Sequence, residues 1–85
     1  MMHELKIQVP FADAIVEGRK TFELRYNDRG FQAGDEVRFH AVVNGLGTSH
    51  PINDRRYAIT YVLGGWGLKD DWVALSIREL LGVDA

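Results

Sequence analysis

The chain has no cysteine among its 85 residues, and this absence restricts its possible folds more than any other feature of the sequence. Disulfide bridges, thiolate metal sites and cysteine nucleophiles are all excluded. A chain of this length buries only about 60–65 % of its unfolded surface. Side-chain packing in one small core must therefore stabilise it, and we expect a single domain over residues 1–85.

Positive and negative side chains are nearly balanced, with a formal net charge of −2. Proteins that coat nucleic acid without sequence preference usually carry a clear basic excess, so this class is disfavoured. The acidic excess lies in residues 61–85, which hold four acidic and two basic side chains. The balanced remainder leaves room for a local basic site.

Membrane, metal and cofactor signals are weak throughout the sequence. No stretch approaches the roughly 20 apolar residues of a membrane span, and the first residues lack a signal-peptide core. We therefore expect a cytoplasmic protein of bacterial type without a membrane partner. The three histidines, His3, His40 and His50, are widely separated, so the sequence predicts neither a metal site nor a cofactor.

Apolar and polar residues alternate in several short runs, and glycine and proline separate these runs. A period of two predicts strands, which we expect at residues 3–9, 21–26, 36–43, 55–63 and 72–80. A helix is expected at residues 11–17, between Pro10 and Gly18. The order predicts an α+β fold, namely a small, mostly antiparallel β-barrel with one early helix, because closure protects sheet edges.

The alternation also predicts which side chains form the core. In the second strand, Phe22, Leu24 and Tyr26 are expected to point inward, opposite a polar stripe. The same reasoning buries one helical face (Phe11, Ala14 and Ile15), one face of the fourth strand (Tyr57, Ile59, Tyr61 and Leu63), and Trp72 at the start of the fifth strand.

The run from Gly18 to Arg25 fits the pattern G-x-K-x-x-E-x-R, with Lys20 and Glu23 at its inner positions. A Gly-Asp turn follows at residues 34–35, and Gly-Trp-Gly-Leu-Lys occurs at 65–69. Together these features resemble the ASCH domain of the PUA-like superfamily of small β-barrels. The opening residues 3–7 and the segment 65–69 also resemble a short bacterial and phage subfamily of ASCH-like proteins known only as a domain of unknown function.

The resemblance implies that the chain binds RNA or a modified nucleoside or nucleotide in a cleft beside the helix-to-strand junction. Lys20, at the end of the helix, either offsets the helix dipole or reaches into that cleft. Glu23 and Arg25 share one face of their strand. They either pair on the surface or line a pocket, and the motif favours the pocket.

Three further residues are candidates for contact with the same ligand. Arg29 and Arg55 either add a basic rim or are ordinary turn and edge charges. Trp66, within a glycine-rich loop, either stacks on a base or plugs the end of the barrel.

An alternative function follows from relatives that remove the acyl group from N4-acylated cytidine. In these relatives a lysine, a threonine three residues later and a later glutamate do the chemistry. Lys20 matches the lysine, but Glu23 occupies the place of the threonine, and Thr21 is the nearest hydroxyl. We therefore do not expect enzyme activity. A protein-interaction or phage-accessory module is a third possibility.

Overall fold

The computed structural model describes residues 1–81. Over this range the chain forms β1 (Met2–Gln8), α1 (Val9–Val16), β2 (Phe22–Tyr26), β3 (Glu36–Val43), β4 (Leu46–Gly47), β5 (Arg56–Gly64) and β6 (Trp72–Leu80). A short 3-10 helix at Pro51–Asp54 precedes β5. The predicted α+β class is confirmed. The helix and the five expected strands begin and end within two residues of their predicted bounds.

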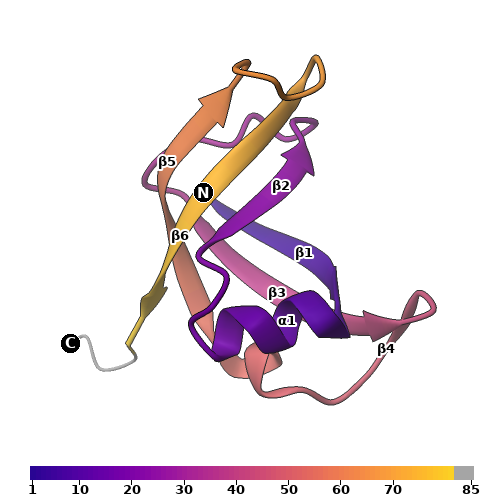
Figure 1. Cartoon of the computed structure of the whole chain (residues 1–85). Helices are drawn as coiled ribbons and strands as arrows, with labels where there is room; N and C mark the ends of the chain where they lie inside the picture. Colours follow the sequence, from indigo (N-terminus) through magenta and orange to yellow (C-terminus); the bar gives the residue numbers. More distant parts are fainter. Residues whose placement is uncertain (82–85) are drawn as a thin grey trace.

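The strands form one mixed sheet in the order β1-β3-β5-β6-β2, with β4 paired to β3. The β1–β3 pair is parallel and the other pairs are antiparallel. The sheet is twisted, and β2 and β1 lie at its two ends (Figure 1). Over residues 1–81 it does not close, so the expected closed barrel is not confirmed. We call the gap between β1 and β2 the seam.

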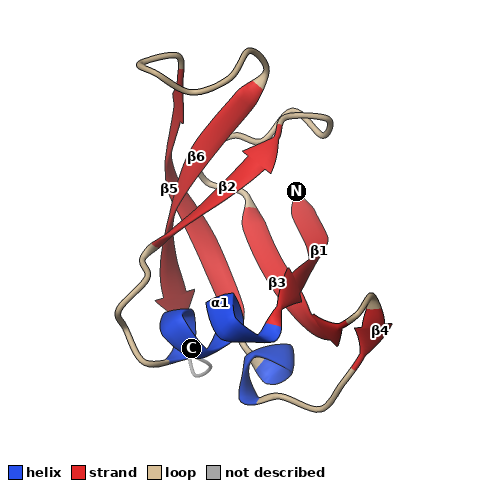
Figure 2. Ribbon diagram, turned by 45° about the vertical axis from the view of Figure 1, so that its right-hand side comes forward, coloured by secondary structure: helices blue, strands red, loops and turns tan. Residues whose placement is uncertain are grey.

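Helix α1 covers one end of the sheet, where it contacts β1, β3 and the 3-10 helix (Figure 2). Pro10 lies in its first turn, where a missing N–H costs little. Ala12 and Ile15 are buried against the sheet, whereas Phe11 is exposed, contrary to the predicted helical face. Consecutive helical residues point about 100° apart, so burying Ala12 turns Phe11 toward the seam. Among the residues described, no helix is long and apolar enough to cross a bilayer.

The core lies between the inner face of the sheet and α1, and its largest fully buried side chains include Phe39, Leu5 and Ile59. Ile52 is also fully buried, although it lies between two predicted strands in a segment for which the sequence predicts no helix or strand. The side chain of Asn53 holds this segment in place. Its oxygen accepts from the amide of Ala41 at 2.9 Å, and its nitrogen donates to the carbonyl of Thr48 at 2.9 Å.

The predicted orientation of β2 is wrong. Phe22, Leu24 and Tyr26 are 45 %, 46 % and 51 % exposed, whereas Glu23 is only 7 % exposed and Arg25 is half-buried. Alternation determines which side chains share a face but not which face lies inside. In this edge strand the inner face looks onto the seam, and ion pairs allow charged side chains to occupy it.

Two further core predictions fail. A β-bulge between Ile59 and Tyr61 shifts the register of β5. Tyr57 and Ile59 are therefore buried, as predicted, but Tyr61 is 61 % exposed. An extra residue reverses the alternation beyond the bulge. Trp72, expected in the core, is also exposed, because it begins β6 at the outer end of the strand.

Candidate functional site

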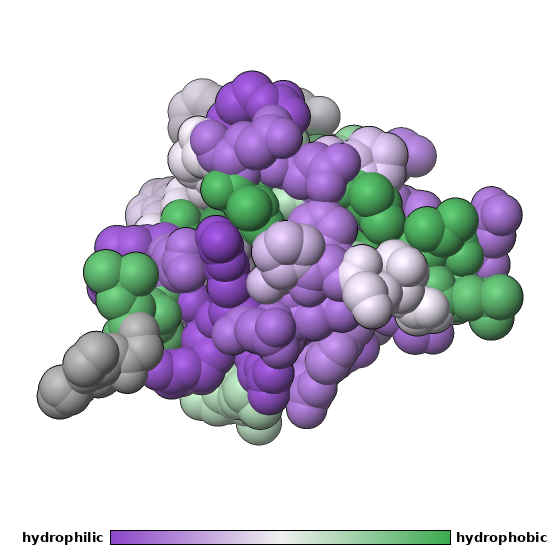
Figure 3. Space-filling view, turned by 90° about the horizontal axis from the view of Figure 1, so that it is seen from below, coloured by the Kyte–Doolittle hydropathy of each residue, from purple (hydrophilic) through white to green (hydrophobic). Residues whose placement is uncertain are grey.

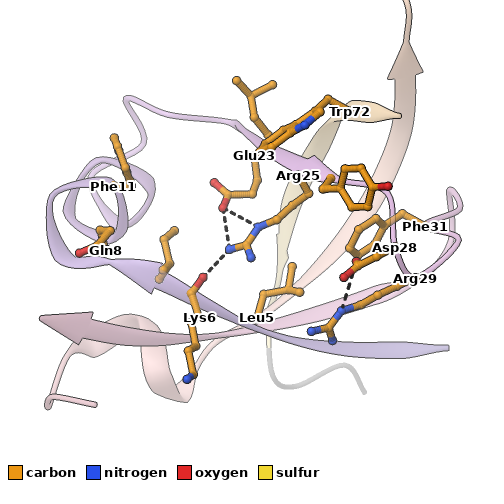
Figure 4. A pocket seen from close by; sticks show the side chains of 13 residues that line it. Leu5, Lys6, Gln8, Phe11, Glu23, Arg25, Asp28, Arg29, Phe31 and Trp72 are labelled. Carbon is orange, nitrogen blue, oxygen red and sulfur yellow. Dashed lines mark hydrogen bonds and ion pairs between the residues drawn. The ribbon is translucent and has the colours of Figure 1, made fainter. Parts of the chain in front are cut away.

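A cleft of about 350 Å³ lies at the seam between β1 and β2 (Figure 4). This volume falls in the range of small-ligand pockets. Charged side chains reach it from β2 and from the turn that follows, whereas β1 contributes apolar side chains such as Leu5 and Ile7. The cleft exists because the sheet stops here instead of closing.

Glu23 is the central polar residue of this cleft. Its Oε1 accepts a hydrogen bond from Lys20 Nζ at 2.6 Å, and its Oε2 accepts from Arg25 Nε at 3.0 Å. Arg25 Nη2 also lies 2.8 Å from Oε2. Two cations therefore compensate the buried carboxylate, as a buried charge requires. The Lys20 ammonium also donates to the carbonyl of Phe22 at 2.6 Å.

Two arginines bridge the seam to the uncovered edge of β1. Arg25 Nη2 donates to the carbonyl of Lys6, and Arg29 Nη1 donates to the carbonyl of Glu4 at 3.1 Å. Figure 4 shows the Arg25 guanidinium between the Glu23 carboxylate and the Lys6 carbonyl, while the Lys6 side chain points away. Side chains thus satisfy carbonyls that a neighbouring strand would satisfy in a closed barrel.

The cleft keeps hydrogen-bonding capacity that these contacts do not use. A guanidinium has five N–H donors, and among the bonds of residues 1–81 none uses Nη1 of Arg25. A carboxylate offers about four lone-pair sites, so Glu23 can accept further hydrogen bonds. Arg29 is half-exposed and only 3.8 Å from the Asp28 carboxylate. The site can therefore donate to an anion and accept from an N–H group.

The structure brings together most of the predicted site residues. Glu23, Arg25 and Arg29 line the cleft. Lys20 lies behind Glu23 and borders an adjoining hollow instead. Lys20 and Arg25 thus both contact Glu23, but Lys20 does not reach into the cleft itself.

Three predicted site residues lie elsewhere. Arg55 does not join the rim, because it precedes β5 and pairs with Glu79 at 3.4 Å. Thr21 borders a separate cavity with Tyr57, away from the cleft. Trp66 is 88 % exposed, so it does not plug the sheet, and it lies outside the cleft lining.

Sequence reasoning missed the aromatic part of the cleft, which comprises Phe11, Tyr26, Phe31 and Trp72. Tyr26 and Trp72 are register partners between β2 and β6, and their rings meet edge to face with centroids 6.3 Å apart. Only the pairing of the second and last strands could have revealed this contact. The alternation pattern assigned Phe11, Tyr26 and Trp72 to the core.

The histidines have structural partners. His3, His40 and His50 each contact one carboxylate, on Asp35, Glu4 and Asp13 respectively. Residues 1–81 contain no group of three or more potential metal-ligating side chains.

The His3 pair supports the turn before β3. His3 Nε2 lies 2.8 Å from Asp35 Oδ2, and this contact is the main reason that the pKa of Asp35 is lowered. Burial opposes this effect and raises the pKa, whereas the backbone N–H of Gln32 and the N-terminal ammonium lower it further. The His3 ring also packs edge-on against Phe31, with centroids 4.7 Å apart, and so supports one wall of the cleft.

The fold and site define a small α+β domain whose open mixed sheet leaves a charged cleft at its seam. The chain belongs to the family described as "Domain of unknown function (DUF3850)", which matches residues 2–77. It is 32 % identical over 81 residues to an uncharacterized 12.9 kDa protein in the GpA 3′ region of Escherichia phage P2, covering 95 % of this chain and 70 % of the phage protein. The expected relation to a phage-containing family of unknown function is confirmed.

A solved structure shares the fold. The crystal structure of hypothetical protein PH0355 aligns with a TM-score of 0.61 over 94 % of this chain and 100 % of that chain, at 17 % identity. At this identity the likeness concerns the fold alone. The ASCH and PUA-like assignment stays a prediction.

Proposed function

We propose that the seam cleft binds RNA or a modified nucleotide, and that the chain is an ASCH-like, PUA-like binding module. The observation that carries this proposal is the buried Glu23 carboxylate, held between Lys20 and Arg25 at one wall of the cleft. A fixed acceptor beside unused guanidinium donors is suited to the edge of a nucleobase.

The two chemical halves of a nucleotide have separate partners in this arrangement. A Glu carboxylate accepts from the exocyclic amine of a base, as it does when proteins read cytosine. Arg29 is half-exposed at the cleft margin, and a guanidinium there suits a phosphate. Tyr26 and Trp72 supply aromatic surface beside them. We therefore assign the base to Glu23 and Arg25, and the phosphate to Arg29.

Fluorescence-anisotropy titration with labelled short RNAs, single-stranded and structured, at two salt concentrations tests the proposal. We expect saturable binding that weakens with salt, because phosphate contacts release counterions. Arg29→Ala should weaken binding about tenfold and flatten the slope of log Kd against log salt by about 0.7.

A matched arginine variant provides the control. Arg55→Ala also removes one arginine from a carboxylate pair, but outside the cleft, and it should leave the affinity unchanged. Absence of saturable binding, or equal losses in the two variants, would overturn the proposal. Glu23→Gln should weaken binding of RNA and should weaken it most for sequences rich in bases that carry an exocyclic amine.

The hydrolase alternative has less support from the site. Thr21 is exposed and borders a different cavity from Glu23. Lys20 borders the same cavity as Thr21, but its ammonium donates to Glu23 and to the carbonyl of Phe22, and among residues 1–81 no hydrogen bond joins it to the threonine hydroxyl. Incubation with N4-acetylcytidine followed by chromatography for cytidine should show no turnover. Turnover that Lys20→Ala abolishes would replace the binding proposal with the hydrolase.

A further inference from the structure

Most aromatic side chains of this chain lie on its surface. Only Phe31, Phe39 and Tyr57 are buried, and the six others are exposed. A domain that depends on packing alone would ordinarily bury such large apolar groups. Five of the six exposed rings lie on β2, at its neighbours in α1 and β6, or in the glycine-rich loop before β6: Phe11, Phe22, Tyr26, Trp66 and Trp72.

The surface around β2 is hollowed at three adjoining places. One is the seam cleft. A second hollow of about 290 Å³ is bordered by Phe11, Lys20 and Phe22, and a third of about 300 Å³ by Leu68, Lys69 and Trp72. Leu24 borders all three. The three hollows therefore adjoin one another around β2, and we call them together the β2 groove.

Each hollow of the β2 groove combines a ring with a cation. In the second hollow, Lys20 Nζ lies 4.9 Å from the centroid of Phe22 and 5.7 Å from that of Phe11. In the third, Lys69 accompanies Trp72. The seam cleft combines Arg25 and Arg29 with aromatic rings. Single-stranded nucleic acid repeats a flat base and a phosphate, and its binding sites combine aromatic rings with basic side chains in the same way.

The glycine-rich loop adds a further ring beyond the groove. Gly65, Trp66 and Gly67 all have positive φ, at 75°, 55° and 90°. For tryptophan this conformation costs about 1–2 kcal/mol. It holds the Trp66 ring in solvent, next to the loop residues that border the third hollow. The molecule seen from the end that α1 covers is largely hydrophilic, with its apolar side chains in separate patches (Figure 3).

We propose that the ligand is a single-stranded oligonucleotide, with one nucleotide in the seam cleft and its neighbours stacked along the β2 groove and on Trp66. This inference rests on the proposed function of the cleft. It adds that affinity depends on the length of the oligonucleotide, so a free nucleotide uses only part of the site. The charge pattern favours nucleic acid over a protein partner, because the cations Lys20, Arg25, Arg29 and Lys69 outnumber the carboxylates Glu23 and Asp28 in the three hollows.

The test compares three probes on the intact protein: a nucleoside monophosphate, a three-nucleotide RNA and a six-nucleotide RNA, all by anisotropy competition. We expect the hexanucleotide to bind at least about tenfold more tightly than the monophosphate, because one stacked base contributes on this scale. Phe22→Ala and Trp66→Ala should each weaken hexanucleotide binding about tenfold. Neither should change binding of the monophosphate.

Tyr61→Ala is the matched control, because the exposure of the Tyr61 ring lies between those of Phe22 and Trp66 and it borders none of the three hollows. It should change neither affinity, and thermal unfolding should show that all variants are folded. Equal affinity for the three probes, lost in Arg29→Ala, would overturn this inference while the cleft proposal stands. Hexanucleotide binding that depends on Phe22 but not on Arg29 would overturn the cleft proposal and, with it, the placement of one nucleotide in the seam cleft. No binding of any probe would overturn both.

Discussion

Glu23→Gln is the substitution that tests most directly how the motif residues stabilise the fold. The change keeps the shape of the side chain but removes the charge that holds Lys20 and Arg25. Both cations keep their own charges in a poorly solvated position, since their side chains are only 16 % and 24 % exposed. The neutral amide can accept one hydrogen bond, but its NH2 group then faces the other cation.

The expected loss of stability lies between the values typical of exposed and of fully buried ion pairs. Exposed pairs contribute less than about 1 kcal/mol, and removing one partner of a fully buried pair costs about 3–5 kcal/mol. Lys20 and Arg25 retain some access to water, so we expect Glu23→Gln to lower the free energy of unfolding by about 2 kcal/mol. For a domain of this size that corresponds to a fall in Tm of roughly 8–16 °C.

Urea unfolding followed by circular dichroism measures this loss. Glu17→Gln is the control, because Glu17 also pairs with a basic side chain, Arg19, but both are mostly exposed. It should change stability by less than about 0.5 kcal/mol. A double-mutant cycle with Lys20→Met should give a coupling energy of at least about 1 kcal/mol. If Glu23→Gln and Glu17→Gln lower stability equally, the ion-pair reasoning is refuted.

Three further outcomes are expected. The folded pKa of Asp35 lies below its ordinary value of 3.8. The contribution of Asp35 to stability is therefore complete above that value and is lost as pH falls through the folded pKa. Across this acid range, the free energy of unfolding should fall less steeply in Asp35→Asn than in the wild type. Gly34→Ala should lower the free energy of unfolding in urea by about 1–2 kcal/mol, since Gly34 has a φ of 97°. Gly47→Ala is the control and should not destabilise the protein, because Gly47 lacks a positive φ and has open space around it. Tyr57→Phe should change the free energy of unfolding by less than about 1 kcal/mol, because the hydroxyl makes no close hydrogen bond among the described residues. A larger fall in urea unfolding would contradict this explanation.

Element positions followed from the sequence because turn residues and local alternation determine them. Pro10 and Gly18 bracket the helix, and β6 begins and ends where its pattern predicts. Which face of β2 is buried could not be deduced in the same way. Whether Glu23 or Leu24 is buried depends on the distant strand that β2 faces, and on the cations available to compensate a carboxylate.

The candidate site was predicted as far as its motif extends. Lys20, Glu23 and Arg25 are close in sequence, so their convergence needs only one strand and one turn. Arg29 and Arg55 were indistinguishable in the sequence, and only the tertiary structure separates the one at the seam from the one beside Glu79. The bulge before Tyr61 is another long-range effect, because it depends on how β5 pairs with β6.

The arginine bridges across the seam have a consequence for how this protein behaves at high concentration. Exposed strand edges with free carbonyls can recruit a strand from another molecule and so start aggregation. Arg25 and Arg29 occupy the carbonyls of Lys6 and Glu4 on the uncovered edge of β1. The two side chains to which we assign a ligand therefore also cap this edge against pairing with a strand of another molecule. Variants that lose either one should be checked for concentration-dependent self-association before a loss of binding is attributed to the cleft.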